Sequence, residues 1–212
     1  MDDKNNSVKN RYDRIAPVYD KFEYIMERLA FIKWRKYLWE LIAESAQAGD
    51  ELLEVGVGTG KNIPYYPEKM NIVAIDFSPG MLTRAREKAD RNDRKVRLKE
   101  EDVQELTFPD DSFDFIVTSC VFCSVPDPVL GFKELNRVIK SDGELYLLEH
   151  VRSKKFLLGP LMDLTNFIPK YIWGANINRH TLNNIRQAGL EIKSVENLWL
   201  DIFKLIIAQK GQ

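Results

Sequence analysis

Short apolar runs separated by amphipathic segments make up most of this chain. The runs are typical of buried strands, since each is rich in Val, Ile, Leu or Phe and lies between turn-forming residues. The predicted strands are 51–55, 71–76, 96–99, 113–119, 144–151, 191–194 and 202–208. The predicted helices are 8–46 with a break at Pro17, then 78–91, 128–139 and 181–187.

The alternation of strands and helices predicts an α/β fold. Right-handed strand–helix–strand units build a mostly parallel sheet with helices on both faces. The two closing strands are joined by too few residues for a crossover helix, which indicates that the last strand runs antiparallel.

A segment without a strand signal, Arg152–His180, interrupts this order. It is rich in Leu, Phe, Pro and Trp, and so long an irregular insert is usually a lid or a binding element. The length of 212 residues suits a single domain. Its expected parts are an N-terminal helical cover (1–48), a ligand-binding core (49–151), the lid-like insert (152–180) and a closing helix with strands (181–212).

Composition narrows the class of protein. Hydrophobic residues make up 44% and charged residues 30%, which excludes intrinsic disorder, and two cysteines are too few for a disulfide framework. The polar start and the lack of an apolar run of ~18 residues argue against a signal peptide or a membrane span. We therefore expect a cytoplasmic protein.

The charge is nearly balanced but unevenly spread. A formal net charge of −1 gives no basic field for nucleic acid, so no nucleic-acid partner is expected. Residues 1–39 carry nine Lys or Arg against six Asp or Glu, and residues 84–99 carry eight against three. Such patches are usually solvated helix faces; the alternative is weak attraction to an acidic substrate or an anionic membrane, at most a peripheral contact.

A glycine-rich turn over Glu54–Asn62 carries the clearest chemical signal. A P-loop would need Gly at Val55 and Ser or Thr at Asn62, so phosphate binding of that kind is excluded. A dinucleotide loop would need its third glycine at Lys61, which weakens that interpretation. The pattern that fits is an acidic residue followed by glycines at every second position.

This pattern resembles motif I of the class I S-adenosylmethionine-dependent methyltransferases. Asp76 ends the next strand 22 residues after Glu54, where the family binds the ribose hydroxyls. Asp102 and Val103 follow the third strand, where the family contacts the adenine amino group. Ser119 and Cys120 leave the fourth strand, beside the methionine part of the cofactor. Gly143 precedes the fifth strand, as is usual in the family.

The resemblance implies S-adenosyl-L-methionine as cofactor and S-adenosyl-L-homocysteine as product, and methyl transfer needs no metal. It assigns to the cofactor Tyr19, Glu54, Gly56, Val57, Gly58, Gly60, Asn62, Asp76, Phe77, Ser78, Met81, Asp102, Val103, Ser119 and Cys120. Carboxylates are expected because the cofactor carries a sulfonium and an ammonium group.

Residues 12–20, YDRIAPVYD, resemble the opening of quinone C-methyltransferases and bacterial phospholipid N-methyltransferases. In those families the segment closes over the acceptor, which makes Tyr19 a candidate contact and catalytic residue. The aromatic residues that follow could form a cage for a cation, or simply pack in the core. They are Phe22, Tyr24, Phe31, Trp34, Tyr37 and Trp39.

Candidate acceptor residues come from the ends of later strands and from the insert. Cys123 and Ser124 follow the fourth strand, and Arg179 could pair with a phosphate or carboxylate. His150 could remove a proton from the acceptor, or could have only a structural hydrogen bond. Cys120 and Cys123 form a CxxC, but without a second such pair a redox or zinc site is disfavoured.

Three hypotheses about function remain open. The first is an enzyme that methylates a small or amphipathic acceptor, preferably a phosphatidylethanolamine-like lipid amine, otherwise a quinone ring, a thiol or a sulfide. The thiol alternative follows from CSVPDP and LLEHV, which resemble stretches of membrane-associated thiol S-methyltransferases. The second is an enzyme acting on RNA, DNA or protein, which the charge disfavours. The third is a non-catalytic protein that binds S-adenosylmethionine.

Overall fold

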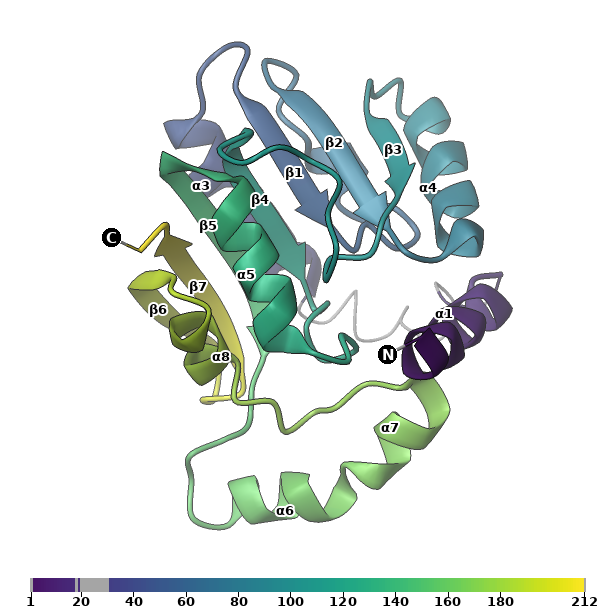
Figure 1. Cartoon of the computed structure of the whole chain (residues 1–212), viewed down its shortest axis with the longest axis vertical. Coiled ribbons are helices and arrows are strands. Elements are labelled where there is room, and N and C mark those ends of the chain that lie inside the picture. Colours follow the sequence, from purple (N-terminus) through teal and green to yellow (C-terminus); the bar gives the residue numbers. More distant parts are fainter. Residues whose placement is uncertain (1, 18, 20–30, 212) are drawn as a thin grey trace.

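A seven-stranded sheet forms the centre of the protein. The computed structural model describes residues 2–17, 19 and 31–211. The strands are β1 (Glu51–Val55), β2 (Asn71–Asp76), β3 (Arg97–Glu100), β4 (Phe113–Ser119), β5 (Ile139–His150), β6 (Glu191–Trp199) and β7 (Phe203–Gln209). Their order is β3-β2-β1-β4-β5-β7-β6, and β7 is antiparallel to both of its neighbours (Figure 1). The pairs among β1 to β5 are parallel.

Helices cover both faces of this sheet. They are α1 (Asp2–Ile15), α3 (Ile32–Ser45), η2 (Ile63–Tyr65), α4 (Pro79–Arg91), α5 (Pro128–Val138), α6 (Leu158–Thr165), α7 (Phe167–Trp173) and α8 (Thr181–Gln187). Side chains of α5 and α8 pack in one hydrophobic cluster, and side chains of α3 and α4 pack in another. The predicted α/β fold, with its antiparallel last strand, is confirmed.

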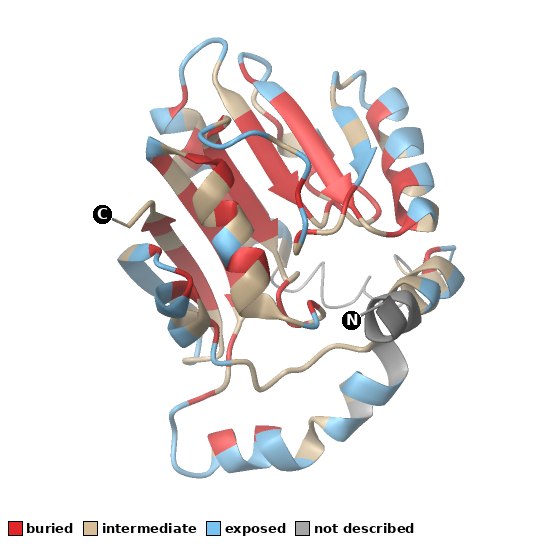
Figure 2. Ribbon diagram, viewed as in Figure 1, coloured by how far each residue is buried: buried red, intermediate tan, exposed pale blue. Residues whose placement is uncertain are grey.

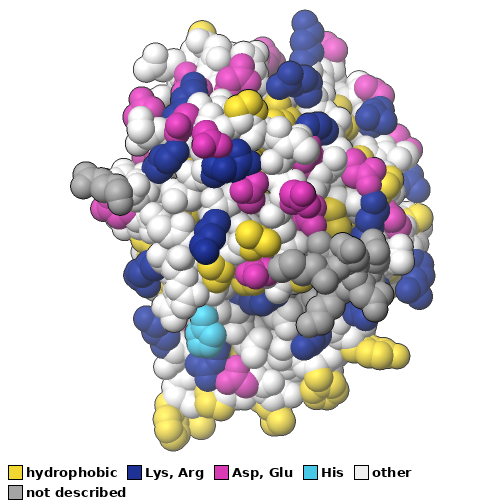
Figure 3. Space-filling model, in the orientation of Figure 1, with side chains coloured by type: hydrophobic (Ala, Val, Ile, Leu, Met, Phe, Trp, Pro, Cys, Tyr) yellow, Lys and Arg dark blue, Asp and Glu magenta, His cyan; other side chains and the backbone are white. Residues whose placement is uncertain are grey.

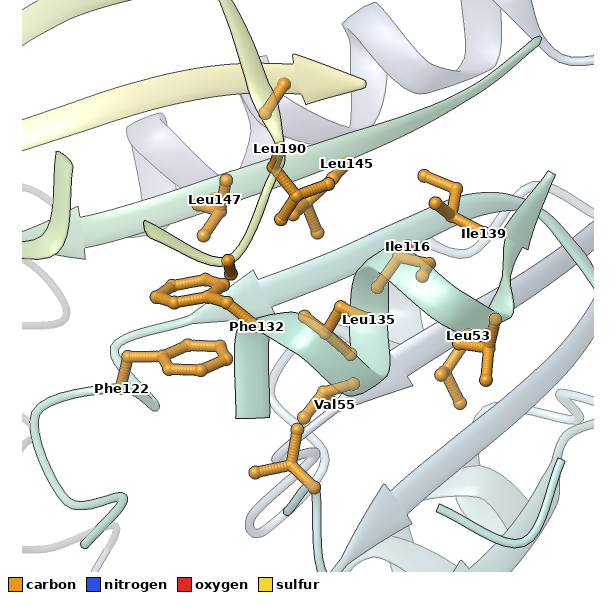
Figure 4. Close-up of a cluster of buried hydrophobic side chains, with 14 of the residues drawn as sticks. Leu53, Val55, Ile116, Phe122, Phe132, Leu135, Ile139, Leu145, Leu147 and Leu190 are labelled. Carbon is orange, nitrogen blue, oxygen red and sulfur yellow. The ribbon is translucent and has the colours of Figure 1, made fainter. Parts of the chain in front are cut away.

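Successive side chains of a strand point to opposite faces of the sheet, and each face contributes to one of these two clusters. Leu53 of β1 belongs to the cluster under α5 and α8, whereas the next residue back, Leu52, belongs to the cluster under α3 and α4. Figure 4 shows the first cluster, in which Leu135 of α5 points toward the sheet and the rings of Phe122 and Phe132 stack 3.6 Å apart. The central strands are buried on both faces, as Figure 2 shows.

Two predicted strands are longer in the structure. The sequence predicts a turn over Ser141-Asp142-Gly143, but β5 continues through it because Ile139 pairs with Phe113 and the register shifts before Phe115. A Cβ at Gly143 would lie 2.9 Å from the carbonyl oxygen of Asp114, so glycine allows the close approach rather than a turn. Strand β6 runs to Trp199 instead of Ser194, through two register shifts against β7.

We expected the insert 152–180 to be irregular. This prediction is wrong, because the insert contains α6 and α7. The prolines at 160 and 169 do not prevent these helices, since each lies in a first helical turn, where the backbone N–H has no intrahelical partner. Across the described parts of the chain, no helix combines the length and the apolar character that a membrane crossing needs.

Helix α1 lies against both the sheet layer and the insert. The Asp13 carboxylate accepts hydrogen bonds from Ser78 Oγ and the Gly80 N–H at the start of α4. Arg11 donates to the carbonyls of Lys170 and Tyr171 in α7, at 2.9 and 3.1 Å. The N-terminal helix therefore connects the cofactor-binding half of the sheet to the insert.

Candidate cofactor site

The glycine loop leaves β1 and turns sharply beside the end of β2. The N–H groups of Gly56 and Val57 both donate to the carbonyl of Ile75, at 2.8 and 2.9 Å. Gly56 has a φ of +69°, and a Cβ there would lie 2.4 Å from Cγ2 of Val121. Only glycine suits both this positive φ and the close approach of Val121, because it has no Cβ and adopts positive φ freely. The loop can thus lie directly against the segment after β4.

Two cavities flank this loop at the carboxyl edge of the sheet, where open α/β sheets bind their ligands. The first cavity holds about 770 Å³ of empty space and the second about 560 Å³, both partly open to solvent. Both cavities are lined by Tyr19, Gly56, Gly58, Ser119 and Cys120, so they lie side by side.

Asp76 forms the polar wall of the first cavity. It is 7% exposed, and its two carboxylate oxygens accept from the N–H groups of Gly58 at 2.9 Å and Ser78 at 3.0 Å. Burial raises the pKa of Asp76 to about 6, although these hydrogen bonds act in the opposite direction. The carboxylate is therefore held in one orientation at the cavity surface.

Asp102 lies across the same cavity, among apolar side chains. It accepts from the N–H of Gln104 at 2.9 Å, and the Gln104 side-chain amide donates to both of its oxygens at 3.1 Å. The Gln104 carbonyl in turn accepts from the N–H of Asp127 at the start of α5. The apolar part of the wall is formed by Phe77, Met81 and Val103. A flat ring with polar edges fits such a wall.

The second cavity carries charges of both signs. Glu54 is buried and accepts hydrogen bonds from the Tyr66 hydroxyl and from Asn62 Nδ2, the latter at 2.7 Å. The Asn62 carbonyl accepts from Arg35 at 2.7 Å. Lys61 lies over the Tyr19 ring, 5.4 Å from its centroid. A carboxylate and two cations around one small cavity suit a zwitterionic ligand group.

Burial also raises the pKa of Glu54 to about 7, and the Tyr66 and Asn62 hydrogen bonds and the Arg35 charge only partly offset this. The sequence did not single out Arg35, Tyr66 or Gln104. For Arg35 there was a signal: it precedes Leu38, Trp39 and Ile42 at helical spacing, and so lies on an apolar face where a cation is unusual.

Most of the predicted cofactor residues line one or both cavities. They are Tyr19, Glu54, Gly56, Val57, Gly58, Asn62, Asp76, Phe77, Met81, Asp102, Val103, Ser119 and Cys120, and the predicted acceptor residue Ser124 joins them. Gly60 and Ser78 lie outside the lining: a Cβ at Gly60 would meet Ile63 of η2, and Ser78 caps α4 through the Met81 N–H.

Three predicted acceptor residues also lie outside both cavities. Cys123 is buried, and burial raises the pKa of its thiol to about 12, so Cys123 itself does not supply a reactive thiolate. Burial lowers the pKa of His150 to about 4, although a hydrogen bond with the backbone of Ile177 acts in the opposite direction. Arg179 donates to the carbonyl of Val125 at 2.6 Å.

The N-terminal aromatic residues divide among several environments. Tyr12 lines the first cavity, its hydroxyl 2.6 Å from Ser124 Oγ and its ring 5.9 Å from that of Phe77. Trp39 is in the core, whereas Phe31 and Trp34 pack around Phe203 of β7. Tyr37 bonds Glu196 at the surface. Phe22 and Tyr24 lie outside the described residues, and those described do not form one cage.

Glu149, next to His150, is a further buried carboxyl of this edge, besides Glu54, Asp76 and Glu101. One oxygen accepts from the N–H groups of Val121 and Phe122 and from the Thr118 hydroxyl, which positions the segment after β4. Burial raises the pKa of Glu149 to about 7. Three carboxyls with raised pKa values therefore surround the two cavities.

These carboxyls make the ligand-free protein less stable as the pH rises. Between about pH 4.5 and 7 the folded state holds protons on Glu54, Glu149 and Asp76 that the unfolded state has lost, so stability falls with pH. His150, with its lowered pKa, acts in the opposite direction between about pH 4 and 6.5, but as a single group. We expect the free energy of unfolding to be about 1 to 3 kcal/mol lower at pH 7.5 than at pH 5.5.

Urea unfolding of the ligand-free protein at these two pH values measures the difference. Glu149→Gln keeps an acceptor for the Val121 N–H but removes one titrating carboxyl, so the variant should show a smaller pH dependence. Equal stability of the wild-type protein at both pH values would contradict this prediction.

Comparisons with known proteins agree with this geometry. Residues 53–147 match a family described as a methyltransferase domain. The phosphatidylethanolamine N-methyltransferase of Cereibacter sphaeroides is 36% identical over 125 residues, which cover 58% of this chain and 60% of that protein. The demethylmenaquinone methyltransferase of Listeria welshimeri is 30% identical over 151 residues, 69% of this chain and 63% of that protein. The chain thus spans less than two thirds of these relatives.

Among solved structures, the [4+2]-cyclase SpnF superposes with a TM-score of 0.78 at 18% identity, and the match covers 98% of this chain and 97% of that one. At this identity the likeness concerns the fold alone. Strand order, glycine loop and cavities together define an α/β protein with a cofactor site at the carboxyl edge of its sheet. With the sequence matches, these features support a class I S-adenosylmethionine-dependent methyltransferase.

Proposed function

We propose that the protein transfers a methyl group from S-adenosylmethionine to a small or amphipathic acceptor, with a phosphatidylethanolamine-like lipid amine as the first choice. The observation that carries this proposal is the pair of adjoining cavities. One has carboxylates beside apolar walls, and the other has a buried carboxylate beside two cations. A nucleoside joined to an amino acid has the same sequence of chemical groups.

The first cavity suits the nucleoside. Asp76 is oriented by two backbone N–H groups and retains acceptor capacity for two ribose hydroxyls. Phe77, Met81 and Val103 provide the apolar surfaces for a base, and Asp102 lies where it can accept from an exocyclic amine. These contacts involve side chains that neighbouring groups already hold in place, so little ordering is needed on binding.

The second cavity suits the amino-acid part. The Glu54 carboxylate attracts an α-ammonium group, and Arg35 and Lys61 attract an α-carboxylate. Bound there, S-adenosylmethionine supplies an electrophilic methyl group on a sulfonium. The two cavities meet at Tyr19, Ser119 and Cys120, and this shared lining supports a sulfonium position beside these residues. Cys120 has a φ of +56°, an unusual conformation that fixes its backbone at this junction.

The acceptor would approach from the side of the first cavity formed by Tyr12, Ser124, Val125 and Pro126. This wall is largely apolar, which favours an amphipathic molecule over a highly charged one. We propose that residues 1–48 and the insert 152–180 form one cover over this side, since Arg11 of α1 bonds to α7. The protein's contribution is then alignment of the acceptor and exclusion of water.

His150 and Arg179 do not belong to this proposal, because neither lines the two cavities. An ammonium acceptor must lose a proton before it attacks, and the cavities offer solvent for this step rather than His150, whose pKa is lowered to about 4.

The relatives support two acceptor classes. The resemblance to a phosphatidylethanolamine N-methyltransferase favours a lipid amine, and the resemblance to a demethylmenaquinone methyltransferase favours a quinone ring. Thiols and sulfides remain a third class. A non-catalytic role is the remaining alternative, because the residues around the cofactor would be the same in a sensor.

Turnover with methyl-labelled S-adenosylmethionine separates these possibilities. The purified protein is incubated with phosphatidylethanolamine vesicles, a demethylated quinone or a small thiol, and label is followed into the extracted product. We expect label in the lipid, and at least tenfold less with Asp76→Ala when the cofactor is below saturation. Label only in the quinone or the thiol would replace the first choice, and cofactor binding without transfer to any acceptor would indicate a sensor.

A further inference from the structure

The insert exposes large apolar side chains to solvent. Six of them have exposed fractions between 53% and 90%. They are Phe156, Leu157, Leu161, Leu164, Phe167 and Tyr171, and we call them the insert ridge. Figure 3 shows hydrophobic side chains gathered along the lower edge of the molecule, where Figure 1 places α6 and α7. Contiguous exposed apolar surface of this kind marks an interaction site.

Part of the insert ridge forms one face of α6, together with Leu157 directly before that helix. Leu157, Leu161 and Leu164 follow one another at intervals of four and three residues, while Met162 between them is buried against the rest of the protein. A surface helix normally turns its polar face to water. Helix α6 turns a leucine face to water instead, which is unfavourable unless another apolar medium covers it.

The charged residues of the insert are mainly positive. Residues 152–180 contain five Lys or Arg against a single acidic residue, Asp163. Asp163 is already paired with Arg152 at 2.7 Å and accepts from Asn178. Lys154 and Lys155 lie just before the ridge, and Lys170 lies within it, all exposed. Apolar residues bordered by lysines complement a surface that is apolar inside and anionic outside.

We propose that the insert ridge docks on a lipid bilayer that contains anionic lipids. The apolar side chains enter the boundary between headgroups and acyl chains, and the lysines lie among the phosphates. A second copy of the chain fits less well, because symmetric pairing would bring the lysines of the two copies together. The proposal concerns a surface outside both cavities and does not depend on the identity of the methyl acceptor.

Docking would also orient the two cavities toward the bilayer. Tyr171 belongs to the ridge, and its carbonyl accepts from Arg11 of α1. The next residue of α1, Tyr12, lines the first cavity. The ridge is thus connected through one helix to the side from which an acceptor would enter, so an acceptor dissolved in the membrane would have a short path.

Sedimentation with vesicles tests the ridge without cofactor or acceptor. The full chain is mixed with vesicles of phosphatidylcholine and phosphatidylglycerol, which contain no phosphatidylethanolamine, so a failure of the methylation proposal leaves this test intact. We expect binding that falls with rising salt. Leu161→Ser/Leu164→Ser should reduce the partition coefficient at least tenfold, and because both side chains are exposed, circular dichroism should show an intact fold.

Charge and control variants complete the test. Lys154→Gln/Lys155→Gln should weaken binding to the anionic vesicles by roughly fivefold for each lysine, and should have little effect on pure phosphatidylcholine vesicles. Val195→Ser, at an exposed position of β6 outside the ridge, should bind like the wild-type protein. Equal binding of the leucine variant and the control would overturn the proposal. So would a dimer in sedimentation velocity that the leucine variant abolishes, together with no vesicle binding.

Discussion

Replacement of Asp76 by alanine is expected to weaken binding of S-adenosylmethionine at least tenfold, as measured by calorimetry. The carboxylate is held by the N–H groups of Gly58 and Ser78, and the substitution removes the acceptor for two ribose hydroxyls. Hydrogen bonds to a charged group contribute about 1.5–3 kcal/mol each, and 1.4 kcal/mol corresponds to a factor of ten in affinity.

The matched control is Asp114→Ala. Asp114 is also a hydrogen-bonded carboxylate at the start of a central strand, but it pairs with Lys140 at the opposite, amino edge of the sheet. This variant should bind the cofactor like the wild-type protein.

A second ligand separates loss of the ribose contact from disturbance of the glycine loop, because Asp76 also holds the Gly58 N–H. A 2′-deoxyribose analogue of S-adenosylhomocysteine should bind the wild-type protein more weakly than the parent compound. Asp76→Ala should no longer distinguish the two ligands. If the variant kept the wild-type preference, the assignment of Asp76 to the ribose would be wrong.

Gly56→Ala is expected to lower the thermal unfolding midpoint by about 5–15 °C. The new Cβ would lie 2.4 Å from Val121 Cγ2, and the φ of +69° is unfavourable for alanine. Overpacking costs about 1–3 kcal/mol, and the positive φ adds about 1 kcal/mol. The loop and the segment after β4 would have to move apart, so cofactor binding should fall as well.

Gly49→Ala provides the matched control for the backbone. Gly49 has a φ of +91°, but no heavy atom lies within 4 Å of its Cβ position, so only the conformational part of the effect remains. The double variant Gly56→Ala/Val121→Ala should recover part of the lost stability, since it removes the clashing methyl groups. Equal destabilisation by Gly49→Ala and Gly56→Ala would show that close approach to Val121 is unimportant.

The likeness to a cyclase limits what the fold says about the reaction. SpnF has a similar fold, and yet it is a [4+2]-cyclase. The groups around the acceptor decide the chemistry, and in the proposed site these are Tyr12, Tyr19, Ser124 and the segment after β4. The reaction is therefore identified by turnover measurements with candidate acceptors rather than by similarity of fold.

The buried core strands could be predicted residue by residue. Strands β1, β2 and β4 have the predicted bounds, because a strand covered on both faces is a continuous apolar run that ends where polar or glycine residues begin. Strand β5 was predicted too short, since its first part depends on pairing with Phe113 and on the space left by Gly143. Helices α6 and α7 were missed, although the leucines of α6 have helical spacing.

The sequence by itself determined the order of strands and helices, the antiparallel last strand and the position of the glycine loop, because these follow from local patterns of apolar, glycine and turn residues. Only the tertiary structure decided what surrounds the carboxylates. Arg35, Tyr66 and Gln104 reach their partners across 27, 12 and 23 residues of chain, and the raised pKa values of Glu54 and Asp76 follow from burial between elements. The outward-facing insert ridge likewise appears only in the folded chain. Burial and long-range contact depend on how elements pack, and no local pattern records that.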